Sequence, residues 1–173
     1  MGTIEASAPG KLFLLGEYAV LHGAPALLTA VDRRARVTVS GANGAGANRA
    51  GSASNAPGDA RWRVSAPAIG IPMCVLESDG GLPAGLDQST RDRLRVFDAV
   101  RRAVARLAVS ASAAPSPTGL TITIDTDSFW HSGHKLGLGS SAAVAVALTT
   151  ALAAAHGLHV TTDQLRTCAT DAH

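Results

Sequence analysis

Two glycines and two serines open an apolar, alanine-rich run, and their order suits the binding of an anion. The run is H-K-L-G-L-G-S-S-A-A-V, from His134 to Val144. If the apolar part is helical, its N-terminus presents N–H groups without intrahelical partners and a partial positive charge. Gly137 and Gly139 allow backbone conformations that other residues avoid, and they leave room for a bulky ligand. Phosphate is the ligand that this arrangement favours.

This run differs from the two commonest phosphate loops. A Walker A loop requires G-x-x-x-x-G-K-[ST], and the dinucleotide-binding fingerprint requires a third glycine that does not occur here. We expect Ser140 and Ser141 to serve as N-cap and first-turn donors, with hydroxyls available to a phosphate or its Mg²⁺. A serine-capped helix after a tight turn, with no ligand, is the alternative that the run alone leaves open.

Length, charge and cysteine content exclude several classes of protein. The chain has 173 residues, enough for one sizeable domain, and a formal net charge of +2, which is too small to indicate a nucleic-acid partner. Cys74 and Cys168 match no disulfide framework or zinc spacing. The apolar runs at 12–15 and 142–155 are too short for a signal peptide or a bilayer span. We therefore expect a cytoplasmic protein without a membrane partner.

Apolar alternation predicts the strands. The expected strands cover residues 3–8, 12–15, 35–40 and 120–125. Residues 61–65 alternate as well, and we interpret them as the return strand of a long hairpin. Residues 66–85 are rich in proline and glycine and are expected to be irregular, and the small polar residues of 41–60 predict a flexible loop within the domain.

Apolar residues at three- and four-residue spacing predict the helices. The expected helices cover 93–109, a segment from about 140 to a C-cap at Gly157, and a segment from an N-cap at Thr162 or Asp163 to His173. The last helix has no closing glycine, proline or polar tail, so the chain looks truncated.

Basic residues in two patterns invite functional interpretations. Arg91, Arg95, Arg102 and Arg106 share one face of the 93–109 helix, and a solvated face is favoured over a pocket for an anionic substrate. The pairs His131/His134 and His156/His159 each have a spacing of three residues. No H-E-x-x-H pattern accompanies them, so surface or packing roles are favoured over metal ligation.

Two motifs in register resemble the GHMP kinase family of small-molecule kinases. They are A-P-G-K-L-F-L-L-G-E-Y-A-V-L-H-G-A-P-A-L (8–27) and K-L-G-L-G-S-S-A-A-V (135–144), and the resemblance spans nearly the entire chain. The G-E-Y of Gly16–Tyr18 and the lysine before the glycine run resemble members that act on mevalonate 5-phosphate. Members that act on mevalonate usually carry G-E-H there. Many family members begin this loop with proline. Residues 131–135 depart from that pattern, as do sequences that resemble the members acting on mevalonate 5-phosphate.

The resemblance implies an α+β fold, namely the N-terminal domain of a two-domain kinase, over residues 1–173. Its sheet would be mixed or antiparallel, with helices packed on one side. ATP and a small phosphorylated acid would bind between this domain and a C-terminal domain. The residues implied to bind the ATP phosphates are Lys135, Gly137, Leu138, Gly139, Ser140, Ser141 and Ala142.

The resemblance also implies the chemistry. Lys11 would be the catalytic residue beside the acceptor, Glu17 and Tyr18 would line the acceptor side, and Mg²⁺ bound with ATP would lie near Ser140 or Ser141. An exposed lysine at a strand end is the alternative for Lys11. The implied reaction is ATP-dependent phosphorylation of mevalonate 5-phosphate to the 5-diphosphate, with mevalonate as the alternative acceptor.

Two features of the family are missing from these 173 residues, and one of them is a third glycine-rich motif that lies in the C-terminal domain. The G-S-G-x-D-type segment that provides the family's aspartate does not occur. The chain is therefore expected to be inactive alone and to need a C-terminal domain or a second copy as its partner. A non-catalytic nucleotide-binding or interaction module is the alternative of a different class.

Overall fold

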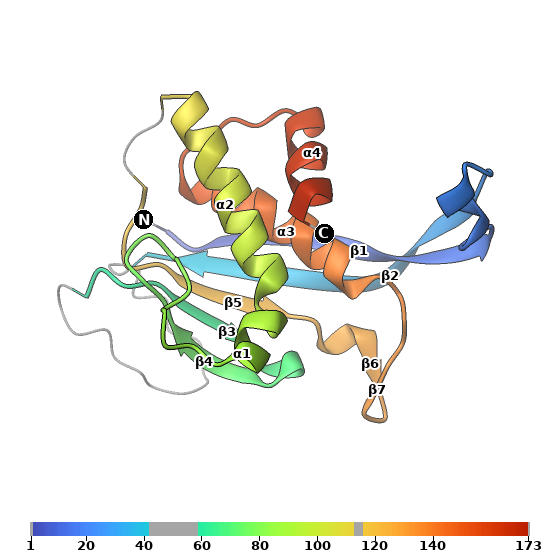
Figure 1. Cartoon of the computed structure of the whole chain (residues 1–173), viewed down its shortest axis with the longest axis horizontal. Helices are drawn as coiled ribbons and strands as arrows, with labels where there is room; N and C mark the ends of the chain where they lie inside the picture. The colour runs from blue at the N-terminus through green and yellow to red at the C-terminus, as the bar shows by residue number, and fades with distance from the viewer. Residues whose placement is uncertain (1, 42–58, 113–115, 173) are drawn as a thin grey trace.

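The computed structural model describes residues 2–41, 59–112 and 116–172. The elements, in chain order, are β1 (Ile4–Leu15), η1 (Ala19–His22), β2 (Leu27–Ser40), β3 (Arg63–Ala66), η2 (Pro67–Ile69), β4 (Ile71–Val75), α1 (Gln88–Arg93), α2 (Arg95–Ser110), β5 (Thr121–Asp125), η3 (Asp127–Phe129), β6 (Trp130–His131), β7 (His134–Lys135), α3 (Ser140–Ala155) and α4 (Thr162–Ala172). They confirm the expected α+β fold (Figure 1). The loop expected over 41–60 falls mostly on residues 42–58, which lie outside the described residues.

Five strands form one mixed sheet in the order β1-β2-β5-β3-β4. β3 and β5 are parallel, and the other neighbouring pairs are antiparallel. The prediction that residues 61–65 return as the partner of 35–40 is therefore wrong, because β5 lies between β2 and β3. Alternation within a strand shows which face is buried, but it does not identify the partner strand.

β4 lies in the segment that was expected to be irregular. It pairs with β3 and contributes Ile71 and Cys74 to the core. Pro72 is compatible with this strand because β4 is at the edge of the sheet, where an absent N–H need not interrupt the ladder. The surrounding prolines and glycines concealed the strand in the sequence.

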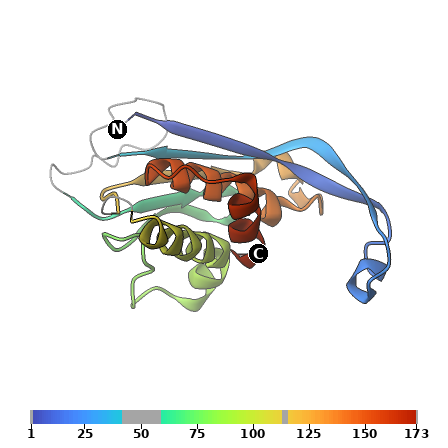
Figure 2. The same ribbon diagram turned by 90° about the horizontal axis from the view of Figure 1, so that it is seen from above.

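Helices α2, α3 and α4 lie on one face of the sheet, as expected (Figures 1 and 2). α3 contacts β1 and β2 as well as α2 and α4. Because it is covered from several directions, its apolar residues surround the helix, and Ala145, Leu148 and Leu152 are fully buried. The C-cap of α3 is His156, one residue before the predicted Gly157, and Gly157 follows it with the left-handed φ of 66° that is common just after a helix.

The helix expected over 93–109 is divided near its start. α1 ends at Arg93, and α2 begins at Arg95 after Leu94. Arg91 therefore belongs to α1, where its guanidinium donates to the backbone carbonyls of the 83–86 segment. The prediction that four arginines share one face of a single helix is wrong for Arg91, because the helix axis is interrupted before Arg95.

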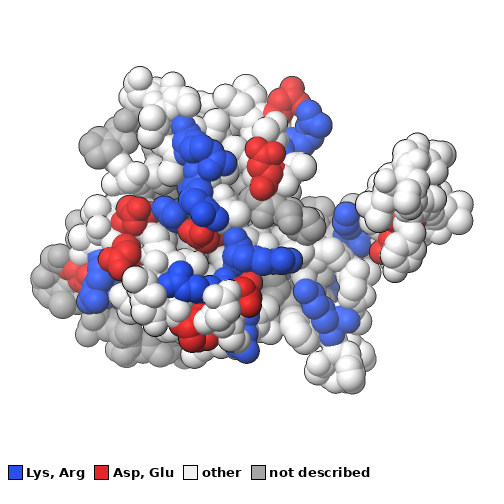
Figure 3. Space-filling model, in the orientation of Figure 1, with Lys and Arg blue, Asp and Glu red and all other residues white. Residues whose placement is uncertain are grey.

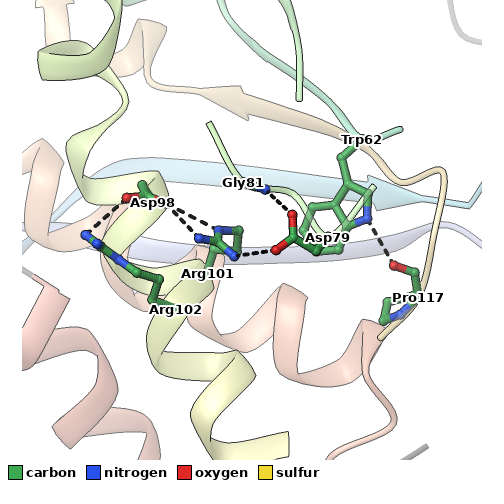
Figure 4. A network of polar contacts seen from close by, with 7 residues as sticks. All are labelled: Trp62, Asp79, Gly81, Asp98, Arg101, Arg102 and Pro117. Carbon is green, nitrogen blue, oxygen red and sulfur yellow. Dashed lines mark hydrogen bonds and ion pairs between the residues drawn. The ribbon is translucent and has the colours of Figure 1, made fainter. Parts of the chain in front are cut away.

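A polar network connects α2 to the loop that precedes α1 (Figure 4). Asp98 pairs with Arg101 and Arg102, each at 3.0 Å. Arg101 also lies 3.5 Å from the carboxylate of Asp79, which accepts a hydrogen bond of 2.8 Å from the N–H of Gly81. Arg101 and Arg102 therefore have structural partners in this loop and helix.

α4 begins with a capping box. The hydroxyl of Thr161 accepts a hydrogen bond of 3.2 Å from the N–H of Gln164, whose side chain accepts one of 2.9 Å from the N–H of Thr161. The N-cap is thus Thr161, one residue before the earliest position that was expected. Within the described part of the chain, no helix has the length and apolar character needed to cross a membrane.

β1 and β2 continue beyond the body of the domain as a two-stranded arm, residues 12–30, with η1 at its tip (Figures 1 and 2). β1 is a single strand where two were expected, and β2 begins well before residue 35. Several leucines on the arm are more than half exposed, namely Leu14, Leu15, Leu21 and Leu27. Apolar exposure of this extent is typical of a contact surface.

Candidate active site

The turn before α3 has the left-handed backbone for which its glycines were predicted. φ is 71° at Gly137 and 70° at Gly139. Gly139 is the N-cap, and no side-chain hydrogen bond among the described residues caps the helix. Ser140 is the first helical residue, so the expectation that a serine serves as the N-cap is wrong. A glycine cap keeps the space in front of the helix open to a bulky anion.

β1 runs directly against this turn. The N–H of Lys11 donates to the carbonyl of Leu138 at 2.9 Å. A Cβ on Gly10 would lie 2.6 Å from that carbonyl oxygen and 2.6 Å from a ring carbon of Phe129. Only glycine at position 10 permits this approach, which brings Lys11 to the start of α3.

Two irregularities in the β1–β2 pairing bracket Lys11. The register shifts between Pro9 and Gly10, and again between Phe13 and Leu15. Such irregularities change the direction of side chains and are frequent beside active sites. The ammonium nitrogen of Lys11 lies 4.9 Å from the centre of the Phe13 ring.

A cavity of about 290 Å³ lies where β1 meets the turn, and we call it the Lys11 hollow. Its lining residues are Lys11, Leu12, Phe13, Glu17, Gly137, Gly139, Ser141 and Ala142. The structure therefore places three predicted features side by side, namely Lys11, Glu17 and the glycine-serine turn. Tyr18 does not line this cavity, and the residue is 79% exposed just before η1.

A second cavity, of about 220 Å³, shares the lining residue Ser141 with the Lys11 hollow, and we call it the arginine hollow. Its lining residues are Ala66, Ile69, Asp92, Arg93, Leu94, Arg95, Val96, Phe97, Ile124, Thr126, Lys135, Ser140, Ser141 and Val144. Lys135, Ser140 and Ser141 were predicted phosphate-binding residues. Residues of the first turn of α3 thus line both cavities.

Lys135 is presented by the short hairpin of β6 and β7. Trp130 pairs with Lys135, and His131 pairs with His134. Ser132 and Gly133 both have positive φ, 48° and 78°, which is the backbone of a type I′ turn. The tight turn fixes the register of the hairpin and so places Lys135 opposite Trp130. Lys135 is also one of the lining residues of the arginine hollow.

Asp92 and Arg93 are lining residues that the sequence did not identify. The series of arginines on the 93–109 helix suggested a substrate role as its less favoured interpretation, and among those four only Arg95 lines the arginine hollow. Arg93, the last residue of α1, lines it as well. Lys and Arg side chains gather over α1 and α2 and continue toward the β6–β7 hairpin (Figure 3).

The histidines are placed separately. His131 and His134 are exposed on the hairpin, whereas His156 is half-buried with its ring 6.4 Å from that of Trp62. Burial lowers the pKa of His156, and no hydrogen-bond partner for its Nδ1 lies among the described residues. Within those residues, no group of three or more His, Cys, Asp or Glu is placed to hold a metal ion.

The two cysteines are both buried and free. Burial raises the pKa of each thiol. Neither lines the Lys11 hollow or the arginine hollow.

Residues 96–173 match the family model described as GHMP kinases N terminal domain. These residues therefore belong to the N-terminal domain of the GHMP kinase family. It is 37% identical over 167 residues to the phosphomevalonate kinase of Streptomyces sp. (strain CL190), an alignment that covers 94% of this chain and 41% of that protein. It is 31% identical over 153 residues to the mevalonate kinase of Methanothermobacter thermautotrophicus, covering 88% and 37%. The chain thus spans about two fifths of the length of these relatives.

Solved structures share the fold. The Streptococcus pneumoniae phosphomevalonate kinase in complex with phosphomevalonate and AMPPNP superposes with a TM-score of 0.68 at 19% identity, covering 96% of this chain and 41% of that one. The Methanococcus jannaschii mevalonate kinase gives 0.66 at 17% identity, covering 98% and 45%. These similarities confirm the fold expected from the two motifs.

Proposed function

We propose that the protein is an ATP-dependent kinase that converts mevalonate 5-phosphate to mevalonate 5-diphosphate. The observation that carries this proposal is that two cavities share Ser141, in the first turn of α3, and that one is lined by Lys11 and the other by Lys135. The similarity to a phosphomevalonate kinase supports the choice of substrate.

The arginine hollow is the proposed nucleotide side. Arg93, Arg95 and Lys135 offer positive charge from three different elements, and the N-terminus of α3 adds its own partial charge. A neighbouring solved structure contains AMPPNP, which supports an ATP analogue as the ligand. In this proposal, backbone N–H groups of 137–142 bind the phosphates, and the cations of the hollow balance their charge.

The residues at this turn fit a magnesium ion that arrives with ATP. Ser140 and Ser141 supply hydroxyl oxygens, and Asp92 is the carboxylate among the lining residues of the arginine hollow. Mg²⁺ typically keeps several waters and binds few protein oxygens together with substrate phosphates. Bound there, it would neutralise charge on the phosphate oxygens.

The Lys11 hollow is the proposed acceptor side, with Glu17 at its wall. A phosphate oxygen of mevalonate 5-phosphate would attack the γ-phosphorus of ATP as the bond from that phosphorus to the ADP oxygen breaks. A phosphate monoester has a second pKa of about 6, so the attacking group is largely ionised at neutral pH and needs no general base. Lys11 would hold the acceptor phosphate in line and stabilise charge during transfer.

Mevalonate kinase activity is the second candidate, and the 31% identical mevalonate kinase of Methanothermobacter thermautotrophicus favours it. Transfer to the hydroxyl of mevalonate requires a group that accepts a proton in the transition state. Glu17 is the carboxylate among the lining residues of the Lys11 hollow. Phosphorylation of mevalonate should therefore depend on Glu17 as the base, whereas phosphorylation of mevalonate 5-phosphate should not.

We further propose that residues 1–173 act as one ATP-binding domain whose exposed arm is covered by a C-terminal domain or by a second copy of the chain. The share of the relatives' length outside the matched region and the exposed leucines of the arm support this arrangement.

An ADP-release assay tests the proposed function. The intact protein that carries this chain would be supplied with ATP and, in turn, mevalonate 5-phosphate, mevalonate, homoserine and galactose. We expect turnover with mevalonate 5-phosphate. Turnover with another acceptor alone would reject the substrate, and nucleotide binding without turnover on any acceptor would indicate a binding module.

A further inference from the structure

Lys11 is restrained at three points by its surroundings. Its N–H is bonded to Leu138, its methylene chain lies against Gly139, and its ammonium lies over the ring of Phe13. We propose that Gly139 and Phe13 are positioning residues for Lys11, so that the turn before α3 and the lysine form one unit. The inference rests on the proposed function, in which Lys11 acts on the acceptor and the transferred phosphoryl group.

The two glycines of the turn show what is particular to Gly139. Both have nearly the same positive φ, so a side chain at either position meets the same backbone strain. A Cβ on Gly139 would lie 2.9 Å from Cγ of Lys11 and 3.3 Å from its Cε, whereas a Cβ on Gly137 would meet nothing within 4 Å. A side chain at position 139 would therefore displace the Lys11 side chain as well as strain the backbone. A side chain at position 137 would strain the backbone alone.

Phe13 restrains the other end of the side chain. Residues 11 and 13 are two apart on β1, and the irregularities of the strand lie outside this pair. The distance of 4.9 Å from the ammonium nitrogen to the ring centre is within the range of a cation–π interaction. Because the two residues are on one strand, this contact depends on the local geometry of β1 and not on packing between elements.

Restraint of this kind has a kinetic consequence. A lysine side chain has many rotamers, and ordering it during the reaction opposes catalysis. Contacts that hold the stem and the ammonium beforehand reduce this ordering. Loss of these contacts should therefore lower kcat at saturating substrates and change the affinity for ATP much less.

A double-mutant cycle tests the role of Gly139. Gly139→Ala and the control Gly137→Ala would be made in the intact protein, each with Lys11 present and with Lys11→Ala, and single-turnover rates, dissociation constants of an ATP analogue and thermal unfolding would be measured. We expect Gly139→Ala to lower the rate about tenfold more than Gly137→Ala when Lys11 is present, a coupling of about 1.4 kcal/mol. With Lys11→Ala, the two glycine variants should have equal rates.

The outcomes separate this inference from the proposed function. If Lys11→Ala leaves the rate unchanged, the proposed role of Lys11 fails. If Lys11→Ala lowers the rate but the two glycine variants differ by the same factor in both backgrounds, only the positioning role of Gly139 is overturned.

A pair of Phe13 variants supplies a second test that holds even if Gly139→Ala does not fold. We expect Phe13→Leu to lower kcat about two- to fivefold at unchanged ATP affinity, the range for a partly exposed cation–π contact. Phe13→Tyr keeps a π face and should retain the rate. Equal rates for Phe13→Leu and the unaltered protein would overturn the role of Phe13.

Discussion

The Lys11 hollow and the arginine hollow share one turn of helix but differ in how they are built. The first has one cation among its lining residues, Lys11, which is held by a strand with irregularities on both sides. The second has three, Arg93, Arg95 and Lys135, which come from α1, α2 and β7. A single restrained charge suits a reacting group that must be aligned, whereas several charges from separate elements suit a polyanion.

The largest effect should come from Lys11→Ala. Removing one group that stabilises transition-state charge lowers kcat by about 10²–10³-fold. We expect a loss of this size, with the dissociation constant of an ATP analogue nearly unchanged, because the side chain lies in the Lys11 hollow. Steady-state kinetics and calorimetric titration measure the two quantities. A parallel loss of ATP affinity would remove the distinction between the cavities.

Gly10→Ala should have the next largest effect. The new Cβ would meet the carbonyl of Leu138 and the ring of Phe129 at 2.6 Å each, so β1 must move away from the turn. Overpacking of this kind lowers the free energy of unfolding by about 1–3 kcal/mol. Urea unfolding would measure the change. Gly2→Ala is the matched control, since nothing lies within 4 Å of its position, and an equal stability of both variants would contradict the close approach.

A smaller effect is expected in the arginine hollow. Lys135→Ala and Arg93→Ala should each weaken binding of an ATP analogue about three- to tenfold, because each removes one of several charges around a polyanion. kcat at saturating ATP should change little. Arg102→Ala is the control, since Arg102 pairs with Asp98 and does not line the cavity. A loss of kcat without a loss of affinity for the ATP analogue would contradict this prediction, because it would give Lys135 and Arg93 a catalytic role like that of Lys11.

The smallest expected effect lies at the far end of α3. Burial lowers the pKa of His156 in the folded state below its unfolded value near 6.5. The unfolded chain therefore binds more protons as the pH falls through this value, and stability should decrease from pH 7 toward pH 5. Thermal unfolding, followed by fluorescence of the neighbouring Trp62, would show a smaller decrease for His156→Gln than for the unaltered protein. Substitution of the exposed His159, as His159→Gln, should give the same pH profile as the unaltered protein. Identical pH profiles for all three proteins would contradict the assignment of this pH dependence to His156.

The Lys11 hollow was largely predictable from the sequence, whereas the arginine hollow was predictable only in part, through Lys135, Ser140 and Ser141. Lys11 and the glycine turn stand in recognisable motifs, so their residue types and order alone indicate phosphate chemistry. The break at Leu94, which ends α1 at Arg93, and the parallel pairing of β3 with β5 were not predicted. Both depend on non-local packing, which the local apolar pattern does not encode.

The account depends most on the place where the ATP phosphates bind. A crystal structure of the intact protein with a non-hydrolysable ATP analogue and mevalonate 5-phosphate would test it directly. We expect the analogue's terminal phosphates at the backbone amides of 137–142, with Lys135 and Arg93 around them and the acceptor phosphate beside Lys11. Phosphates bound away from the start of α3, or an acceptor in the arginine hollow, would contradict it.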